Sequence, residues 1–237
     1  MNIDEAEEYL GDYLYNGLAS EIFWAEQAHA LAEEIGRHAN QINDANYGQL
    51  FGAFQAILSD RQTLAIAKIF DPPSNRFPTR SIPAILNHLE VHADLWKLPD
   101  RQKLHEELAK GGVDITLLEK LSAPDLTRAV VSRFQSTLPS RSNVDRLSLS
   151  LEALRESRNK VIAHNEAVDP ATRRRPTWGD ATPLVNYAKH FVSTVGRGFL
   201  GIHFEINGQF LLTEDAHRNS RALNRFFRAA GLAPDSA

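Results

Sequence analysis

The sequence predicts an all-α fold. Apolar residues recur every three or four positions along most of the chain, for example at Leu10, Leu14, Leu18 and Ile22, and this spacing is typical of helices that bury one face. Glycine and proline fall at the ends of the periodic segments, and there is no repeat and no low-complexity tract. We therefore expect one helical domain over residues 1–237, with about seven or eight helices.

The first helices are predicted with clear ends. One helical pattern covers residues about 4–39 and a second covers about 44–69, for which Asp44 is a suitable N-cap. The sequence DPPSNRFP at 71–78 must end the second helix, because proline lacks an amide donor and restricts the residue before it. Ser81 then caps a third helix, which is expected to run to about residue 96 with a proline in its first turn.

Serine, glycine and proline also divide the middle of the chain. The two glycines of AKGGVD end the next helical segment. Ser122 caps the helix that follows, with Pro124 in its first turn, and Pro139 ends it. Ser142 or Asn143 then starts the helix that carries SRNKVIAHNE at 157–166.

The C-terminal quarter is predicted to hold two helices and a small hairpin. The helices cover about 181–203 and about 214–230, and the turn dipeptide Asn207-Gly208 lies between short apolar runs. The last helix is basic, and a solvated face is the favoured interpretation of its arginine stripe over a nucleic-acid site. The stripe consists of Arg218, Arg221, Arg225 and Arg228, and Phe226 and Phe227 are expected to dock the helix.

Composition excludes several kinds of protein. The chain has no cysteine, which excludes disulfide frameworks, iron–sulfur clusters and thiolate chemistry. The acidic N-terminus MNIDEAEEYL lacks the apolar core of a signal peptide, and no apolar run is long enough to span a membrane. We therefore expect a cytoplasmic protein with no membrane partner.

Charge is distributed unevenly along the chain. Residues 1–118 carry 9 Lys and Arg against 18 Asp and Glu, whereas residues 119–237 carry 17 against 12. A basic C-terminal half is suited to contact with a polyanion. It is equally consistent with helix surfaces that are charged only for solubility.

The stretch SRNKVIAHNE places an arginine on an apolar stripe. At about 100° per residue, Arg158 falls within about 40° of Leu151 and Leu154. A buried guanidinium is costly unless it is paired or faces a cavity or a partner. Arg158 is therefore either part of a site for an anion or a structural arginine paired with a carboxylate, such as Glu152 or Glu156 of another helix or molecule.

His164 does not share the face of Arg158. It lies six residues further on, which is about 120° around an ideal helix and about 9 Å along it. The two side chains converge on one anion only if the helix ends between them, if the length of arginine closes the gap, or if a second copy of the chain supplies one of them. A histidine near a helix C-terminus also commonly complements the helix dipole.

The sequence resembles a known superfamily at these residues. RNKVIAHN, with Arg158, Asn159 and His164, matches the Arg-(Asn/Asp/His)-x(3–5)-His motif of the HEPN superfamily, the higher-eukaryote and prokaryote nucleotide-binding helical domains. LAIAKIFDP at 64–72 and SIPAIL at 81–86 are similar to the AbiU-type abortive-infection branch. The resemblance covers roughly residues 5–200 and implies a HEPN-like helical bundle with additional helices; the tail after about residue 205 has no counterpart.

The resemblance implies an endoribonuclease that needs no metal and no cofactor, acting as a toxin or phage-defence effector. In such families the arginine and the histidine act on the scissile phosphate and the ribose 2′-hydroxyl, and the polar residue after the arginine helps to place them. The product is a 2′,3′-cyclic phosphate. The cleft forms where two copies pack their motif helices, so we expect an RNA substrate, a homodimer through the motif helix and an antitoxin protein as a further partner.

The residue types suit this chemistry. Arg158 carries a permanent charge and a fork that matches phosphate, and it could stabilise charge that develops there. His164 titrates near neutrality and can move a proton, and the Asn159 amide can orient either of them. Four further cations near the motif are candidates for contact with the RNA backbone, although a solvated loop explains the three arginines among them equally well. They are Lys160, Arg173, Arg174 and Arg175.

No metal site is predicted. His88 and His92 have the i, i+4 spacing of two ligands on one helix face, and Asp94 is close by, but no third ligand follows at a recognisable spacing. Phosphate-binding glycine motifs and nucleophilic serine motifs are also absent from the sequence.

A second function class stays open at this point. The chain could be a non-catalytic HEPN-like module that binds nucleic acid, a nucleotide or a protein partner. An open cleft lined by Arg158 and His164 favours the enzyme, whereas a buried His164 and an Arg158 paired with a carboxylate favour the module.

Overall fold

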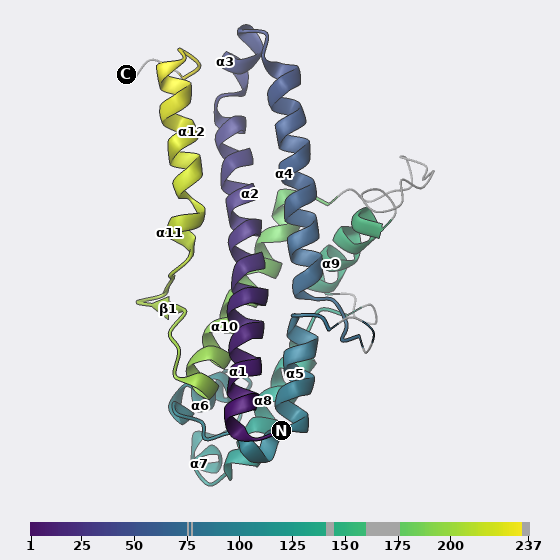
Figure 1. The fold of residues 1–237 in the computed structure, drawn as a ribbon, viewed down its shortest axis with the longest axis vertical. Helices are drawn as coiled ribbons and strands as arrows, with labels where there is room; N and C mark the ends of the chain where they lie inside the picture. The colour runs from purple at the N-terminus through teal and green to yellow at the C-terminus, as the bar shows by residue number, and fades with distance from the viewer. Residues whose placement is uncertain (75, 77, 141–144, 160–175, 234–237) are drawn as a thin grey trace.

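The computed structural model describes residues 1–74, 76, 78–140, 145–159 and 176–233. Within this part of the chain, helices form almost all of the regular structure, and one two-stranded sheet accompanies them (Figure 1). The predicted all-α fold with one small hairpin is confirmed. None of the described helices is both long and apolar enough to cross a membrane.

The N-terminal segment is one long helical rod. Helix α1 (Ile3–Asp12), the π-helical segment η1 (Tyr13–Ala19) and helix α2 (Ser20–Arg37) follow one another without a break. The predicted apolar stripe is the reason for its place in the core, because Leu10, Leu14 and the stripe residues that follow have no exposed surface. Four later helices, at 48–69, 178–200, 213–216 and 218–229, pack directly against this rod (Figure 1).

Helix α4 (Gly48–Ile69) returns antiparallel to α2 and packs along it (Figure 1). The prediction that Asp44 caps this helix is wrong. Asp44 is the last residue of the short helix α3 (Ala39–Asp44), and α4 begins only after Tyr47. The reason is the left-handed backbone of Asn46, with φ of 64°, which turns the chain between the two helices. The C-cap of α4 is Phe70, directly before Asp71 and the two prolines with which the predicted break begins.

The middle of the chain forms a layer of shorter helices at the end of the molecule where the N-terminus lies (Figure 1). These helices are α5 (Ile82–Val91), η2 (Ala93–Leu95), α6 (Arg101–Lys110), α7 (Ile115–Leu118) and α8 (Ala123–Thr137). The predicted caps are confirmed, since Ser81 Oγ accepts from the Ala84 amide at 3.3 Å and Ser122 Oγ from the Asp125 amide at 3.2 Å. Helix α5 stops at Val91 instead of about residue 96, and a single 3₁₀ turn follows it.

Helix α9 (Arg146–Ser157) starts later than predicted. Its N-cap is Asp145, whose Oδ1 accepts from the Ser148 amide at 3.0 Å. An aspartate in this role satisfies an amide that the helix itself cannot pair. The predicted starts, Ser142 and Asn143, lie outside the described residues.

Helix α10 (Trp178–Leu200) packs against α9, α6 and the N-terminal rod. It begins three residues earlier than predicted because Thr177 and Asp180 form a capping box. It ends at Gly201, whose φ of 68° gives the left-handed C-cap that glycine adopts readily.

A hairpin and two helices complete the chain. Strands β1 (Glu205–Ile206) and β2 (Gln209–Phe210) pair antiparallel, and the turn residues between them both have positive φ. Helix α11 (Thr213–Ala216) and helix α12 (Arg218–Ala229) then run beside α2 (Figure 1).

The last helix is docked by one phenylalanine instead of the two that were predicted. Phe227 is fully buried, whereas Phe226 is 55% exposed. Phe227 belongs to a small apolar cluster with Ile35, Ile42, Phe51 and Leu232, separate from the main core. The four arginines of the predicted basic stripe are all exposed, and Arg221 pairs with Glu214 at 3.1 Å.

Candidate functional site

Arg158 lies where the sequence places it, on the buried side of α9. It is the C-cap of that helix and keeps helical backbone angles, with φ of −56° and ψ of −52°. Leu151 and Leu154 on the same side are 1% and 2% exposed, and the Arg158 side chain is 24% exposed. The predicted position of an arginine on the apolar stripe is therefore confirmed.

Asp71 is the charged partner of Arg158. The guanidinium Nη1 donates to Asp71 Oδ1 at 2.7 Å, and Nε donates to Asn159 Oδ1 at 3.0 Å. The Asp71 side chain is itself only 22% exposed. Two hydrogen bonds to groups from different segments fix the plane of the guanidinium, and partial burial strengthens the charged one.

A second arginine ties α9 to the same point of the chain. The Arg155 guanidinium donates to the carbonyl of Phe70, the residue before Asp71. Arg155 and Arg158 are three positions apart and therefore lie on one side of α9. Both hold the C-terminal end of α4, where unpaired carbonyls and the helix dipole attract cations.

The proline-rich break explains why these contacts form. Asp71 is followed by two prolines, which cannot continue α4 and force the chain to leave it there. The carboxylate is thus held at a fixed position beside the helix end. Because α4 and α9 pack against each other, this position lies within reach of Arg158.

The structure brings some of the predicted site residues together. Arg158 and Asn159 are in direct contact. Lys160, His164, Arg173, Arg174 and Arg175 lie outside the described residues. Arg158 does pair with a carboxylate, as the structural interpretation expected, and within the described residues this carboxylate is that of Asp71.

Asp71 and Arg155 are the site residues that the sequence interpretation missed. Periodicity could not find the Asp71 contact, since the ion pair joins residues 87 positions apart. One signal was present, because Asp71 lies in the FDP sequence on which part of the family resemblance rests.

Asp71 also lines a cavity of about 230 Å³. Lys68 and Arg80 are the cations in its lining, and each is paired with a carboxylate: Lys68 Nζ with Glu21 at 2.8 Å and Arg80 Nε with Asp12 at 2.7 Å. The hydrogen bond from Arg80 lowers the pKa of Asp12, which keeps this carboxylate ionised. The surroundings of the Arg158–Asp71 pair are therefore polar and charged.

The histidines of α5 do not assemble a metal site with their acidic neighbour. The ring centroids of His88 and His92 are 4.9 Å apart, but the Asp94 carboxylate pairs with Arg128 at 3.1 Å. Within the described residues, no group of three or more histidine, aspartate or glutamate side chains could hold a metal ion.

Comparison with known families decides the affiliation of the chain. The family model HEPN_AbiU2, described as AbiU2, matches residues 7–217. The chain belongs to the AbiU2 family of HEPN domains. The predicted HEPN resemblance, including its AbiU-type branch, is confirmed.

The region that matches the AbiU2 family includes the residues of the Arg158 site. Asp71 and Arg158 lie within it, and so does the sequence position of His164. The match also extends past the predicted limit near residue 205, so the hairpin and α11 belong to the AbiU2 domain. Searches among curated proteins and among solved structures give no significant match.

Proposed function

We propose that this AbiU2-family protein is an endoribonuclease of HEPN type that cleaves RNA without a metal ion and serves as a toxin or phage-defence effector. Membership in a HEPN family associated with abortive infection supports the class of activity. The observation that carries the proposal is the three-quarters-buried guanidinium of Arg158, oriented by Asp71 and Asn159.

Arg158 is proposed to bind the scissile phosphate. A guanidinium has five N–H donors, so its bonds to Asp71 and Asn159 do not exhaust its capacity. Its planar fork matches two phosphate oxygens, and a preoriented cation stabilises charge that develops there in the transition state. Asp71 is a positioning residue in this scheme, since it acts on the phosphate only through Arg158.

His164 is proposed to move the proton. The imidazole accepts the proton of the ribose 2′-hydroxyl, and the 2′-oxygen forms a bond to phosphorus while the bond to the 5′-oxygen breaks. The leaving 5′-oxygen takes up a proton from water and the imidazolium returns its proton to the solvent, so the products are a 2′,3′-cyclic phosphate and a 5′-hydroxyl, with no oxidant or reductant needed. Lys160 and Arg173 to Arg175 would contact the RNA backbone, where cations supply sequence-independent affinity.

Two copies of the chain are proposed to form the cleft. Along a continuous helix, His164 would lie about 120° away from Arg158, so one motif helix is a poor source of both groups. Packing of two motif helices removes this difficulty, because each copy can complete the site of the other. An antitoxin protein would then be a further partner of the dimer.

A non-catalytic module is the second candidate function. The ion pair of Arg158 with Asp71 favours it, because a structural arginine needs such a partner. In this case the domain would bind nucleic acid, a nucleotide or a protein without cleavage.

Cleavage of RNA by the purified protein separates the two candidates. We expect single-stranded RNA to be cut in the presence of EDTA, with cyclic phosphate ends detected by mass spectrometry. His164→Ala should reduce the rate by at least about 100-fold, the lower range for loss of a catalytic proton carrier. An RNA that stays intact, while a control ribonuclease cuts it in the same buffer, would assign the protein to the non-catalytic class.

A further inference from the structure

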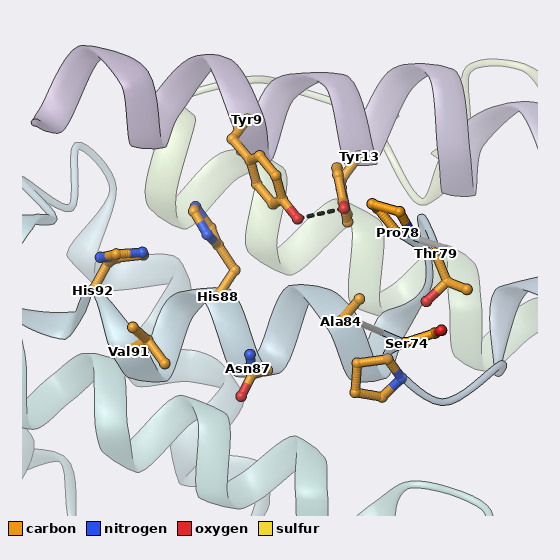
Figure 2. A pocket seen from close by; sticks show the side chains of 11 residues that line it. Tyr9, Tyr13, Ser74, Pro78, Thr79, Ala84, Asn87, His88, Val91 and His92 are labelled. Atoms are coloured by element: carbon orange, nitrogen blue, oxygen red, sulfur yellow. Dashed lines mark hydrogen bonds between the residues drawn. The ribbon is translucent and has the colours of Figure 1, made fainter. Parts of the chain in front are cut away.

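A second cavity lies between the N-terminal rod and α5, with the loop residues Pro73, Ser74, Pro78 and Thr79 along one side (Figure 2). Its volume is about 300 Å³. Figure 2 shows Tyr9 and Tyr13 reaching from the rod toward α5 and the loop, with His88 on α5 and His92 directly after this helix. We refer to it as the tyrosine–histidine cavity.

Four aromatic rings form one wall of this cavity. The ring of Tyr9 is stacked between those of Tyr13 and His88, with centroid distances of 4.1 and 4.3 Å. His92 continues the row at 4.9 Å from His88. The Tyr13–Tyr9–His88 contacts are stacked and the His88–His92 contact is edge-to-face, and rings packed in this way hold their polar edges in fixed positions for a ligand.

The wall offers both a donor and an acceptor. The Tyr9 hydroxyl donates to the Tyr13 hydroxyl, which retains its own proton for another acceptor. His88 Nε2 lies 3.3 Å from the carbonyl of Ala6. A carbonyl can only accept, so Nε2 carries the hydrogen, and Nδ1 of a neutral His88 is an acceptor. Burial lowers the pKa of His88 and raises that of Tyr9, so both are neutral at neutral pH.

The lining contains no carboxylate. This sets it apart from the rest of residues 1–118, which carry twice as many acidic as basic residues. Its polar side chains are hydroxyls, an amide and imidazoles. Such a lining accepts an uncharged polar group or a group next to a phosphate, and it does not repel an anionic chain.

The cavity adjoins the Arg158 site through the same loop. Pro78 and Thr79 line both the tyrosine–histidine cavity and the smaller cavity that contains Lys68 and Arg80. Asp71, the partner of Arg158, lines that smaller cavity. The two cavities therefore adjoin each other at Pro78 and Thr79, and the smaller one contains the carboxylates of Asp71 and Glu21 as well as the two cations.

We propose that the tyrosine–histidine cavity binds the base and ribose of one nucleotide of single-stranded RNA, next to the phosphate that Arg158 holds. Proteins recognise single-stranded RNA by placing unpaired bases among aromatic side chains and bonding to their edges. A volume of about 300 Å³ is at the lower limit for small-ligand sites, which suits one nucleotide. The inference rests on the proposed function only for the identity of the RNA as substrate.

The test measures binding, so that it does not depend on cleavage. Anisotropy of fluorescent single-stranded RNAs with 2′-O-methyl groups would be recorded for the full chain, because such RNAs cannot form a cyclic phosphate. Tyr9→Phe and Tyr13→Phe keep the rings and remove the hydroxyls. Each should weaken RNA binding about 3- to 10-fold, the usual effect of one lost hydrogen bond. His92→Ala, at a half-buried position, is a further variant that does not depend on the tyrosines.

Tyr15→Phe is the matched control. Tyr15 belongs to the same helical segment but is half exposed and contacts Phe204, at a centroid distance of 5.1 Å, away from the cavity. Unchanged RNA affinity in folded Tyr9→Phe, Tyr13→Phe and His92→Ala proteins would overturn the proposal. So would binding of a nucleoside monophosphate that depends on Tyr13 when RNA binding does not. RNA that is bound through the cavity but never cleaved would instead refute the proposed function and leave this site in place.

Discussion

At the residue scale, the contact between Arg158 and Asp71 bears on both the stability of the protein and its proposed activity. Each side chain is less than a quarter exposed, so neither charge is fully hydrated. A charge in that position is stable only while its partner is present. The pair thus connects stability and the proposed activity in one contact, and the two effects can be measured separately.

Asp71→Asn should affect both properties. The amide keeps the shape of the carboxylate but removes its charge, so we expect the free energy of unfolding to fall by about 1–3 kcal/mol. A guanidinium that is no longer held in one orientation should also lower kcat for RNA cleavage by about 10- to 100-fold, with a smaller change in KM. Urea unfolding and steady-state kinetics measure the two effects.

Asp94→Asn is the control for this substitution. Asp94 also pairs with an arginine, but its side chain is 78% exposed, and exposed pairs contribute little. We expect neither stability nor kcat to change in this variant. Equal effects of the two substitutions would show that Asp71 has no special role at Arg158.

His88 should make the stability of the protein depend on pH. Burial, with a smaller contribution from nearby His92, lowers the pKa of His88 below its ordinary value of 6.5, although the bond to the Ala6 carbonyl opposes this shift. The unfolded chain therefore binds more protons than the folded chain, and stability falls as the pH drops below about 6.5. His88→Gln removes the titrating group, so its unfolding midpoint in urea should change less than that of the wild type between pH 7.5 and pH 5.5. Parallel losses in both proteins would exclude His88 as the cause.

At the element scale, the sequence was sufficient for the helices and insufficient for several of their ends. The structure contains the helices predicted from apolar periodicity and from the caps Ser81 and Ser122. It also contains the hairpin predicted from the Asn207-Gly208 turn. Asp44 was misplaced because the left-handed turn at Asn46 depends on how α3 and α4 pack, which no local pattern reports.

The same difference between local patterns and long-range contacts applies to the site. Arg158 could be predicted because it interrupts a local apolar stripe. Asp71 could not be predicted as its partner, since that contact requires α4 and α9 to be packed together first. Long-range pairing is a property of the tertiary structure, whereas periodicity is a property of one helix.

Substitution of two adjacent phenylalanines tests which of them docks α12. Phe227 is fully buried against His38 and Phe51, whereas Phe226 is 55% exposed. Phe227→Ala leaves a cavity and should lower the free energy of unfolding by about 3–5 kcal/mol. Phe226→Ala should cost about 1 kcal/mol or less, because most of that ring is already in water. Thermal unfolding of both variants provides the comparison, and similar losses would contradict the assigned docking.

At the scale of the whole molecule, two of the exposed apolar surfaces bear on association between copies of the chain. Leu149 is 39% exposed on α9, the helix that leads into the motif. A cavity of about 560 Å³ between α2, α4 and α12 is lined only by apolar residues, among them Ile57, which is 63% exposed. A contiguous apolar lining such as that of this cavity is characteristic of contact with another protein or a ligand.

If two copies associate through the motif helix, as proposed, substitutions on these two surfaces should have different effects. Leu149→Glu would place a charge in that interface and should convert the dimer to a monomer in light scattering after size-exclusion chromatography. Ile57→Glu, on the other apolar surface, should leave the dimer intact. If only Ile57→Glu produces monomers, the copies associate through α4 and the motif helices do not meet.

The catalytic role of Arg158 is tested most directly by the initial rate of RNA cleavage for wild type and Arg158→Ala, compared at a temperature where both are folded. Our account predicts cleavage by the wild type in EDTA and a loss of at least about 100-fold in the variant, as expected when a donor to the transition state is removed. Folded Arg158→Ala protein that cleaves at the wild-type rate would contradict it.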